Sequence, residues 1–180
     1  MTNKEIILEG YKLGDKNEGP TELAKILFKS LEANNGFNKT DLINRYHHWW
    51  NTGAFDTGPT FAMVFQKVSQ GLSSEQASIQ VYKELKGATA GCGPAHRIAP
   101  MAGYSEKPTD RLLSIAIEEA NITHYHKDAG FCSAIMVLLC RYLIEGNSWQ
   151  ESKEIVSQNE DLKSTWNKIE IASLNNGGFV

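Results

Sequence analysis

Hydrophobic residues recur every three to four positions along nearly the whole of the 180-residue chain. This spacing places them on one face of a helix, with polar residues on the opposite face. No run of alternating β-branched residues is long enough to favour a strand. The pattern therefore predicts an all-α fold. The core positions that it predicts are Leu23, Ile26, Leu27, Leu31, Leu42, Ile43, Tyr46, Trp49, Trp50, Phe61, Val64, Phe65, Val68, Ala77, Val81, Tyr82, Leu85, Leu112, Ile115, Ala116, Ala120, Trp149, Ile155, Val156, Leu162, Trp166 and Ile169.

Local start and stop signals divide this pattern into separate helices. Residues 1–20 are interrupted by Gly10, Gly14 and Gly19, so we expect a short helix there, followed by irregular chain. The segment 131–144 is apolar on most of its circumference and is expected at the centre of the fold. Residues that suit a first turn or a helix cap predict helix starts at Pro20, Thr40, Ser73, Pro108 and Ser148.

The composition fits one globular domain over residues 1–180, with 41% hydrophobic and 22% charged residues. The net charge of −3 gives no basic surface, so neither nucleic acid nor an anionic membrane is expected as a partner. Cys92, Cys132 and Cys140 form no Cys-x-x-Cys pair, which favours a reducing compartment. The longest apolar run, Phe131–Leu139, is far shorter than a membrane span. We therefore expect a cytoplasmic protein.

Small residues and glycines concentrate in residues 87–104, between two predicted helices, and the segment includes the pair His96-Arg97. Because glycine has no Cβ, the backbone can approach a ligand closely there. This segment is the binding site that the sequence predicts. A plain connecting loop is the alternative, since glycine and proline are common wherever helices are joined.

Two further polar clusters are candidates for chemistry. Asp56 lies in the turn-rich segment 52–59 and is either a functional carboxylate or a cap that accepts backbone N–H groups. His124 and His126 precede the most hydrophobic segment of the chain. They are two positions apart, whereas two histidines that hold zinc from one helical face are four apart. A zinc site is therefore not expected.

Four segments, taken in order, resemble the ADP-ribosylglycohydrolase family. The likeness covers about residues 19–180, and the order and spacing of the segments carry it. The segments are Thr21-Glu-Leu-Ala with its helix and Gly36-Phe37, Arg45 to Gly58, Gly91 to Pro100, and Ile122-Thr-His124 leading to Ala129-Gly130.

The resemblance implies an orthogonal multi-helix bundle that, with magnesium, cleaves the N- or O-glycosidic bond between ADP-ribose and a protein side chain. ADP-ribose or an ADP-ribosylated protein would be the partner. By the same resemblance Asp56 and His124 would be catalytic, and Thr21 and Asp56 would be magnesium ligands. The implied ligand-binding residues are Thr89, Gly91, Cys92, Gly93, His96, Arg97 and His124.

The sequence departs from the family pattern where magnesium would bind. Glu18-Gly-Pro-Thr21 takes the place of the family's Thr-Asp-Asp-Thr motif, so both aspartates are absent. The closing Gly-Asp-x-Asp-Thr motif does not occur before Val180, and we expect the domain to be incomplete at its C-terminus. Cys92 and His96 replace the usual Asn and Met. Magnesium takes oxygen ligands, usually with one or two carboxylates, so the ligand set is expected to be incomplete.

Three functions from different classes remain open. In a hydrolase, Asp56 or Glu18 would be the base, and His96 or His124 would be the acid or a hydrogen-bond donor to the ligand. A binding module without catalysis would still bind ADP-ribose in the presence of a chelator. A structural relative, like the lens crystallins of the family, or a truncated one would expose apolar surface, which predicts a homo-oligomer.

Overall fold

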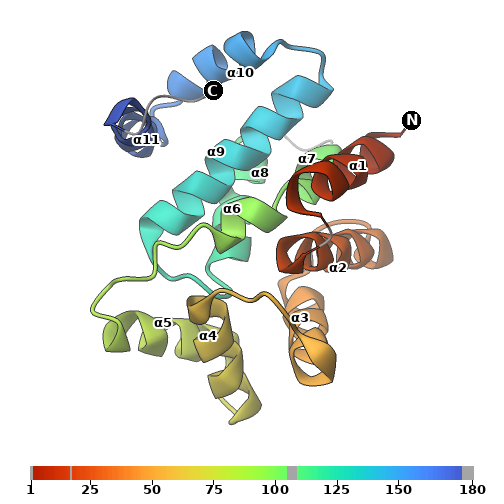
Figure 1. Ribbon diagram of the computed structural model, residues 1–180, viewed down its shortest axis with the longest axis vertical. Coiled ribbons are helices and arrows are strands. Elements are labelled where there is room, and N and C mark those ends of the chain that lie inside the picture. The colour runs from red at the N-terminus through yellow and green to blue at the C-terminus, as the bar shows by residue number, and fades with distance from the viewer. Residues whose placement is uncertain (1, 17, 105–108, 176–180) are drawn as a thin grey trace.

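A computed structural model of the chain describes residues 2–16, 18–104 and 109–175, which form eleven helices and no strand (Figure 1). The predicted all-α fold is confirmed. The helices are α1 (Asn3–Asp15), α2 (Gly19–Asn34), α3 (Lys39–Gly53), α4 (Pro59–Ser69), α5 (Ser74–Glu84), α6 (Gly93–Arg97), α7 (Pro100–Tyr104), α8 (Thr109–Ala120), α9 (Lys127–Ile144), α10 (Trp149–Ser157) and α11 (Lys163–Asn175). Within these described residues, no helix is both long and apolar enough to cross a membrane.

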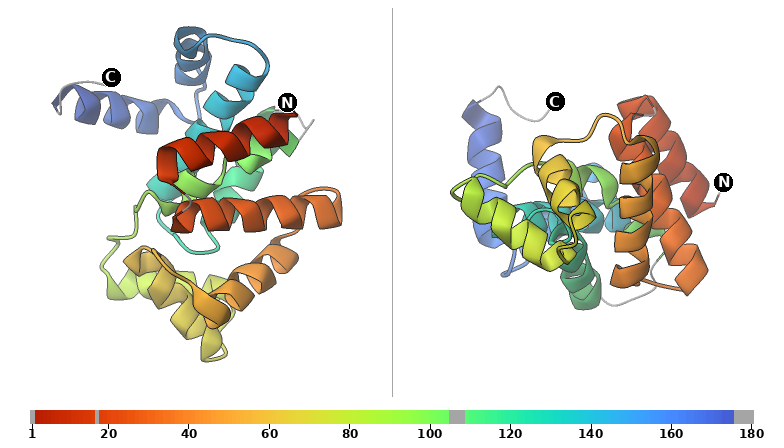
Figure 2. Two further views of the ribbon diagram at one scale, coloured as in Figure 1. Left: turned by 45° about the vertical axis from the view of Figure 1, so that its right-hand side comes forward. Right: turned by 90° about the horizontal axis from the view of Figure 1, so that it is seen from below.

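Helix α9 runs through the middle of the molecule, as its apolar circumference predicts (Figure 1). It contacts α6, α7, α8, α10 and α11. Helices α3, α4 and α5 gather at one end of the molecule, and α10 and α11 lie at the other (Figure 2). Because neighbours cover α9 on several sides, eight of its 18 residues are buried, and it forms the axis on which the other helices are placed.

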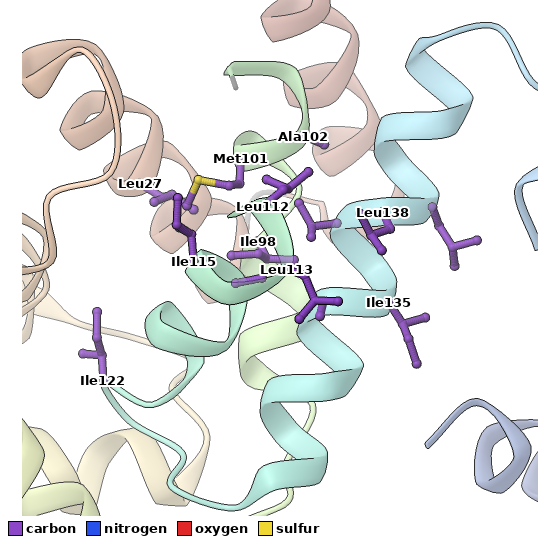
Figure 3. Packing of buried hydrophobic residues seen from close by; sticks show 14 of the residues in the cluster. Leu27, Ile98, Met101, Ala102, Leu112, Leu113, Ile115, Ile122, Ile135 and Leu138 are labelled. Carbon is purple, nitrogen blue, oxygen red and sulfur yellow. The ribbon is translucent and has the colours of Figure 1, made fainter. Parts of the chain in front are cut away.

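One contiguous hydrophobic core joins α2, α3, α4, α8 and α9 with the segment 98–102. Figure 3 shows Leu112 of α8 in this core, between Leu27 of α2 on one side and Leu138 of α9 on the other. Each fully buried aliphatic side chain contributes roughly 1.5–3 kcal/mol relative to an exposed one. A smaller cluster between α4 and α5 is formed by Val64, Ala77 and Val81.

Local signals predicted several helix starts correctly. Capping boxes are present at Ser73 and Ser148, and Pro20 lies in the first turn of α2. The cap of α3 was predicted wrongly: Asn38, and not Thr40, accepts the N–H of Asp41. Both residue types suit a cap, and the helix begins at the earlier one. The predicted start at Pro108 lies outside the described residues.

The N-terminal segment differs from its prediction, because α1 continues through Gly10 and Gly14. A capping box between Thr2 and Glu5 stabilises its first turn, and Ile7 is buried against the body of the molecule. Glycine within a helix costs about 1 kcal/mol relative to alanine, which lowers the stability of a helix without forbidding it.

The segment 87–104, expected as a connecting loop, contains the two short helices α6 and α7. Pro94 and Pro100 stand in their first turns, where the missing N–H of proline costs nothing. Ile98 and Met101 from this segment are buried. The segment is therefore part of the core as well as of the surface.

Two predicted core residues are exposed. Trp149 and Ile155 of α10 are 49% and 38% exposed, while Val156 of the same helix is buried. Helix α10 packs mainly on α9, so only one narrow face of it is covered. The outward Trp149 ring instead lies under the Lys153 ammonium group, 5.8 Å from its centroid.

Candidate functional site

The glycines that precede and open α6 lie directly against the ring of His124. A Cβ added to Gly91 would stand 3.2 Å from His124 Nε2, and one added to Gly93 would stand 3.4 Å from Cε1. The histidine is 4% exposed, whereas Gly91 is exposed. Backbone without side chains therefore lies directly against this edge of the ring, as the predicted close approach requires.

A chain of buried polar groups extends inward from His124. Thr123 Oγ1 lies 2.7 Å from His124 Nδ1, and Arg97 Nη2 donates to Thr123 Oγ1 at 3.0 Å. Arg97 Nε donates to Glu119 Oε1 at 2.7 Å, and the hydroxyl of Tyr46 donates to the same oxygen at 2.9 Å. These five residues come from α3, α6, α8 and the turn before α9, and they tie the four elements together.

The ion pair in this chain is fully buried, with Arg97 1% exposed and Glu119 completely covered. The guanidinium group also lies over the Tyr46 ring, 5.3 Å from its centroid. Burial and the neighbouring carboxylate of Glu119 raise the pKa of the Tyr46 phenol, so that group stays protonated and donates. Such a pair stabilises little in itself, but breaking it leaves an uncompensated buried charge.

The hydrogen bonds favour one tautomer of His124. Arginine is only a donor, so the hydroxyl of Thr123 accepts from Arg97 and has its own proton left for His124 Nδ1. Burial, followed by the charge of Arg97, lowers the pKa of His124 to about 3, so the ring is neutral at physiological pH. In a neutral ring with Nδ1 accepting, the proton is on Nε2. His124 therefore presents an N–H donor toward Gly91 and Gly93.

A second polar cluster surrounds the first turn of α2. Asp15 Oδ2 accepts from the backbone N–H of Thr21 at 2.9 Å and from its hydroxyl at 2.6 Å. Asp56 Oδ2 accepts from the N–H of Gly19 at 3.1 Å. Both carboxylates thus satisfy N–H groups that a helix leaves unpaired and sit at the positive end of its dipole. This position favours the interpretation of Asp56 as a helix cap over that of a functional carboxylate. The helix that it caps is α2, which begins 37 residues earlier in the chain.

These groups do not fit the magnesium site that the resemblance implies. A Cβ at Gly19 would stand 2.3 Å from the carbonyl oxygen of Asp56 and 2.8 Å from that of Phe55, so position 19 has no space for an aspartate. The hydroxyl of Thr21 is directed at Asp15. In the described part of the chain, no group of three or more His, Cys, Asp or Glu side chains has the geometry of a metal site.

The other predicted ligand-binding residues do not all lie together. Gly91, Gly93 and His124 are in contact, while Arg97 stands behind them in the core. Cys92 and His96 are exposed, and Cys92 is a free thiol. Thr89 is buried, and its hydroxyl has no hydrogen-bond partner among the described residues. Sequence reasoning missed Tyr46 and Glu119 as members of this site, since nothing local marks them. Thr123 belongs to the Ile122-Thr-His124 segment of the resemblance, but no role was predicted for it.

Comparison with known proteins identifies one family. A family model described as ADP-ribosylglycohydrolase matches residues 16–175. The chain has no match among curated proteins or among solved structures. The matched region includes the buried polar chain at His124, all of the second polar cluster except Asp15, and all of the helices from α2 to α11.

Proposed function

Because the chain belongs to the ADP-ribosylglycohydrolase family, we propose that it binds an ADP-ribosyl group at the surface formed by Gly91, Gly93 and His124, without magnesium. The observation that carries this proposal is the position of His124 Nε2 directly beneath two glycines, and the hydrogen bonds of the ring favour a proton on that nitrogen. ADP-ribose is rich in acceptor oxygens on its ribose and diphosphate groups. A neutral donor and exposed glycine backbone suit such oxygens.

The same chain of hydrogen bonds supports binding more than acid catalysis by His124. The Nε2 proton of a neutral imidazole is a hydrogen-bond donor and is not readily transferred at physiological pH. The carboxylate of Asp56, the other predicted catalytic group, is engaged by the N–H of Gly19. A general base must reach a water molecule beside the reacting bond, and one oxygen of this carboxylate is already occupied as a helix cap.

Calorimetric titration of ADP-ribose into the whole chain, once with magnesium and once with a chelator, tests the proposal. We expect the same affinity in both. Gly91→Val should remove binding by covering the His124 edge, whereas Gly58→Val, at an exposed glycine with open space around it, should not.

Each other outcome contradicts the proposal in a different way. Heat only with magnesium would mean that a metal site exists, and release of free ADP-ribose from an ADP-ribosylated peptide would then be measured. No heat in either titration would leave the fold as a scaffold.

A further inference from the structure

A cavity of about 560 Å³ lies between α1, α6 and α9, and its lining does not include His124. Gly93 of α6 lies against His124, whereas Ala95 and His96 of the same helix line this cavity. The volume is within the range of about 300–1,000 Å³ that is typical of small-molecule sites. The cavity is thus a second concave region, separate from the surface at Gly91.

The walls of the cavity are mainly apolar. Ile7 and Tyr11 of α1 face Cys140 and Ile144 of α9 across it. Burial raises the pKa of the Cys140 thiol to about 11, so this group is uncharged at physiological pH. Apolar cavities of this kind accept apolar ligands and exclude ions.

Three large apolar side chains of the cavity lining are open to solvent. Ile6, Met136 and Leu143 are 46%, 37% and 41% exposed. Single exposed apolar residues are common on protein surfaces, but these three line one concave site. Their exposure means that a ligand can reach the cavity from solvent.

Two glycines of α1, Gly10 and Gly14, face the cavity one helical turn apart. A Cβ at either position would meet no atom within 4 Å, and neither glycine has the positive φ that requires this residue. Each costs about 1 kcal/mol of helix stability relative to alanine. Packing inside the chain therefore does not demand them, and the space that they leave is part of the cavity.

Asp15, Tyr11 and His96 supply the polar groups of the lining. One oxygen of Asp15 is held by Thr21, and the other has no hydrogen bond within the described residues. That oxygen can accept from a ligand hydroxyl or N–H. A phosphate is disfavoured, because the carboxylate repels it and the remaining walls cannot solvate it.

We propose that this cavity binds an uncharged, largely apolar small molecule that carries one hydroxyl or N–H group for Asp15. This site is distinct from the proposed ADP-ribose surface and does not depend on it.

A fluorescence titration with N-phenyl-1-naphthylamine, a neutral apolar probe with one N–H group, tests the proposal on the whole chain. We expect saturable enhancement of its emission. Gly10→Leu and Gly14→Leu place a side chain in the open space and should weaken binding by roughly tenfold or more. Lys12→Leu adds the same side chain to α1 outside the cavity lining and should leave binding unchanged.

The variants remain informative because leucine favours helix more than glycine does, so lost binding cannot be attributed to unfolding of α1. Absence of saturable enhancement, or equal binding by Gly10→Leu, Gly14→Leu and the unsubstituted chain, would overturn the proposal. So would loss of ADP-ribose binding in Gly10→Leu, because the cavity would then belong to the ADP-ribose site. ADP-ribose binding that fails in the unsubstituted chain, with probe binding retained, would contradict only the proposed function.

Discussion

Replacing Thr123 by valine tests whether the buried chain of hydrogen bonds fixes the ring of His124. Valine has nearly the shape of threonine, so Thr123→Val removes the hydroxyl and leaves little empty space. The change deletes the 2.7 Å contact with His124 Nδ1 and takes from Arg97 Nη2 its 3.0 Å acceptor. We expect this substitution to show the effect of the lost hydrogen bonds of Thr123 with little change in its packing.

The magnitude follows from burial. A buried donor left without a partner costs about 1–3 kcal/mol, and more when it is charged, as Arg97 is. We therefore expect Thr123→Val to lower the free energy of unfolding by about 2–3 kcal/mol. Thr123→Ser keeps the hydroxyl and loses one methyl group, which costs about 1 kcal/mol. Urea denaturation of both variants measures the difference.

The ring itself is observed by ¹⁵N NMR of His124. In the unsubstituted chain we expect the spectrum of a neutral ring protonated on Nε2 at pH 7. In Thr123→Val the two tautomers should average, and affinity for ADP-ribose should fall by about fivefold, since one oriented neutral donor is worth about 1 kcal/mol. In Thr123→Ser the original tautomer should return. An Nδ1-protonated or charged ring in the unsubstituted chain would refute the reasoning.

Three further outcomes are expected. Folding lowers the pKa of His124 from about 6.5 to about 3. Between these pH values the unfolded chain binds a proton that the folded chain does not. The free energy of unfolding should therefore fall as pH falls from about 6.5 to 3, by up to about 1.4 kcal/mol per pH unit. Urea titrations across this range should show a smaller slope in His124→Gln. Glu119→Gln leaves its buried guanidinium partner unpaired and should cost about 3–5 kcal/mol by urea denaturation, while Glu118→Gln, at an exposed site, should cost less than about 1. Gly19→Ala places a Cβ 2.3 Å from the carbonyl oxygen of Asp56 and should lower the midpoint of thermal unfolding, with a cost of about 1–3 kcal/mol; an unchanged midpoint would show that this contact is absent in solution.

The sequence predicts what depends on neighbours along the chain. The capping boxes at Ser73 and Ser148 are set by residues three positions apart, and both occur as predicted. The apolar circumference of residues 131–144 likewise identifies the central helix, because a helix that is apolar on most sides must be covered on most sides.

Contacts between distant residues were not predictable in this way. Glu118 and Glu119 look alike in the sequence, yet Glu119 is buried and bonded to Tyr46, 73 positions away. Asp56 caps a helix that begins at Gly19, whereas sequence neighbours suggest a cap for the helix that follows it. In each case the tertiary fold, and no local preference, selects the partner.

The buried pair of Arg97 and Glu119 has a consequence for the rotation of α8 about its own axis. Successive residues of a helix are about 100° apart, so a turn of α8 by one position could carry Glu119 outward to the place of Glu118, whose side chain is 43% exposed, and bring Ala120 to face Arg97. The guanidinium group would then have to follow a carboxylate at another angle or remain buried without one. Apolar side chains tolerate a small rotation by repacking, but a directed hydrogen bond of 2.7 Å does not. The ion pair thus adds a directional constraint to the angular position that the hydrophobic face of α8 already favours.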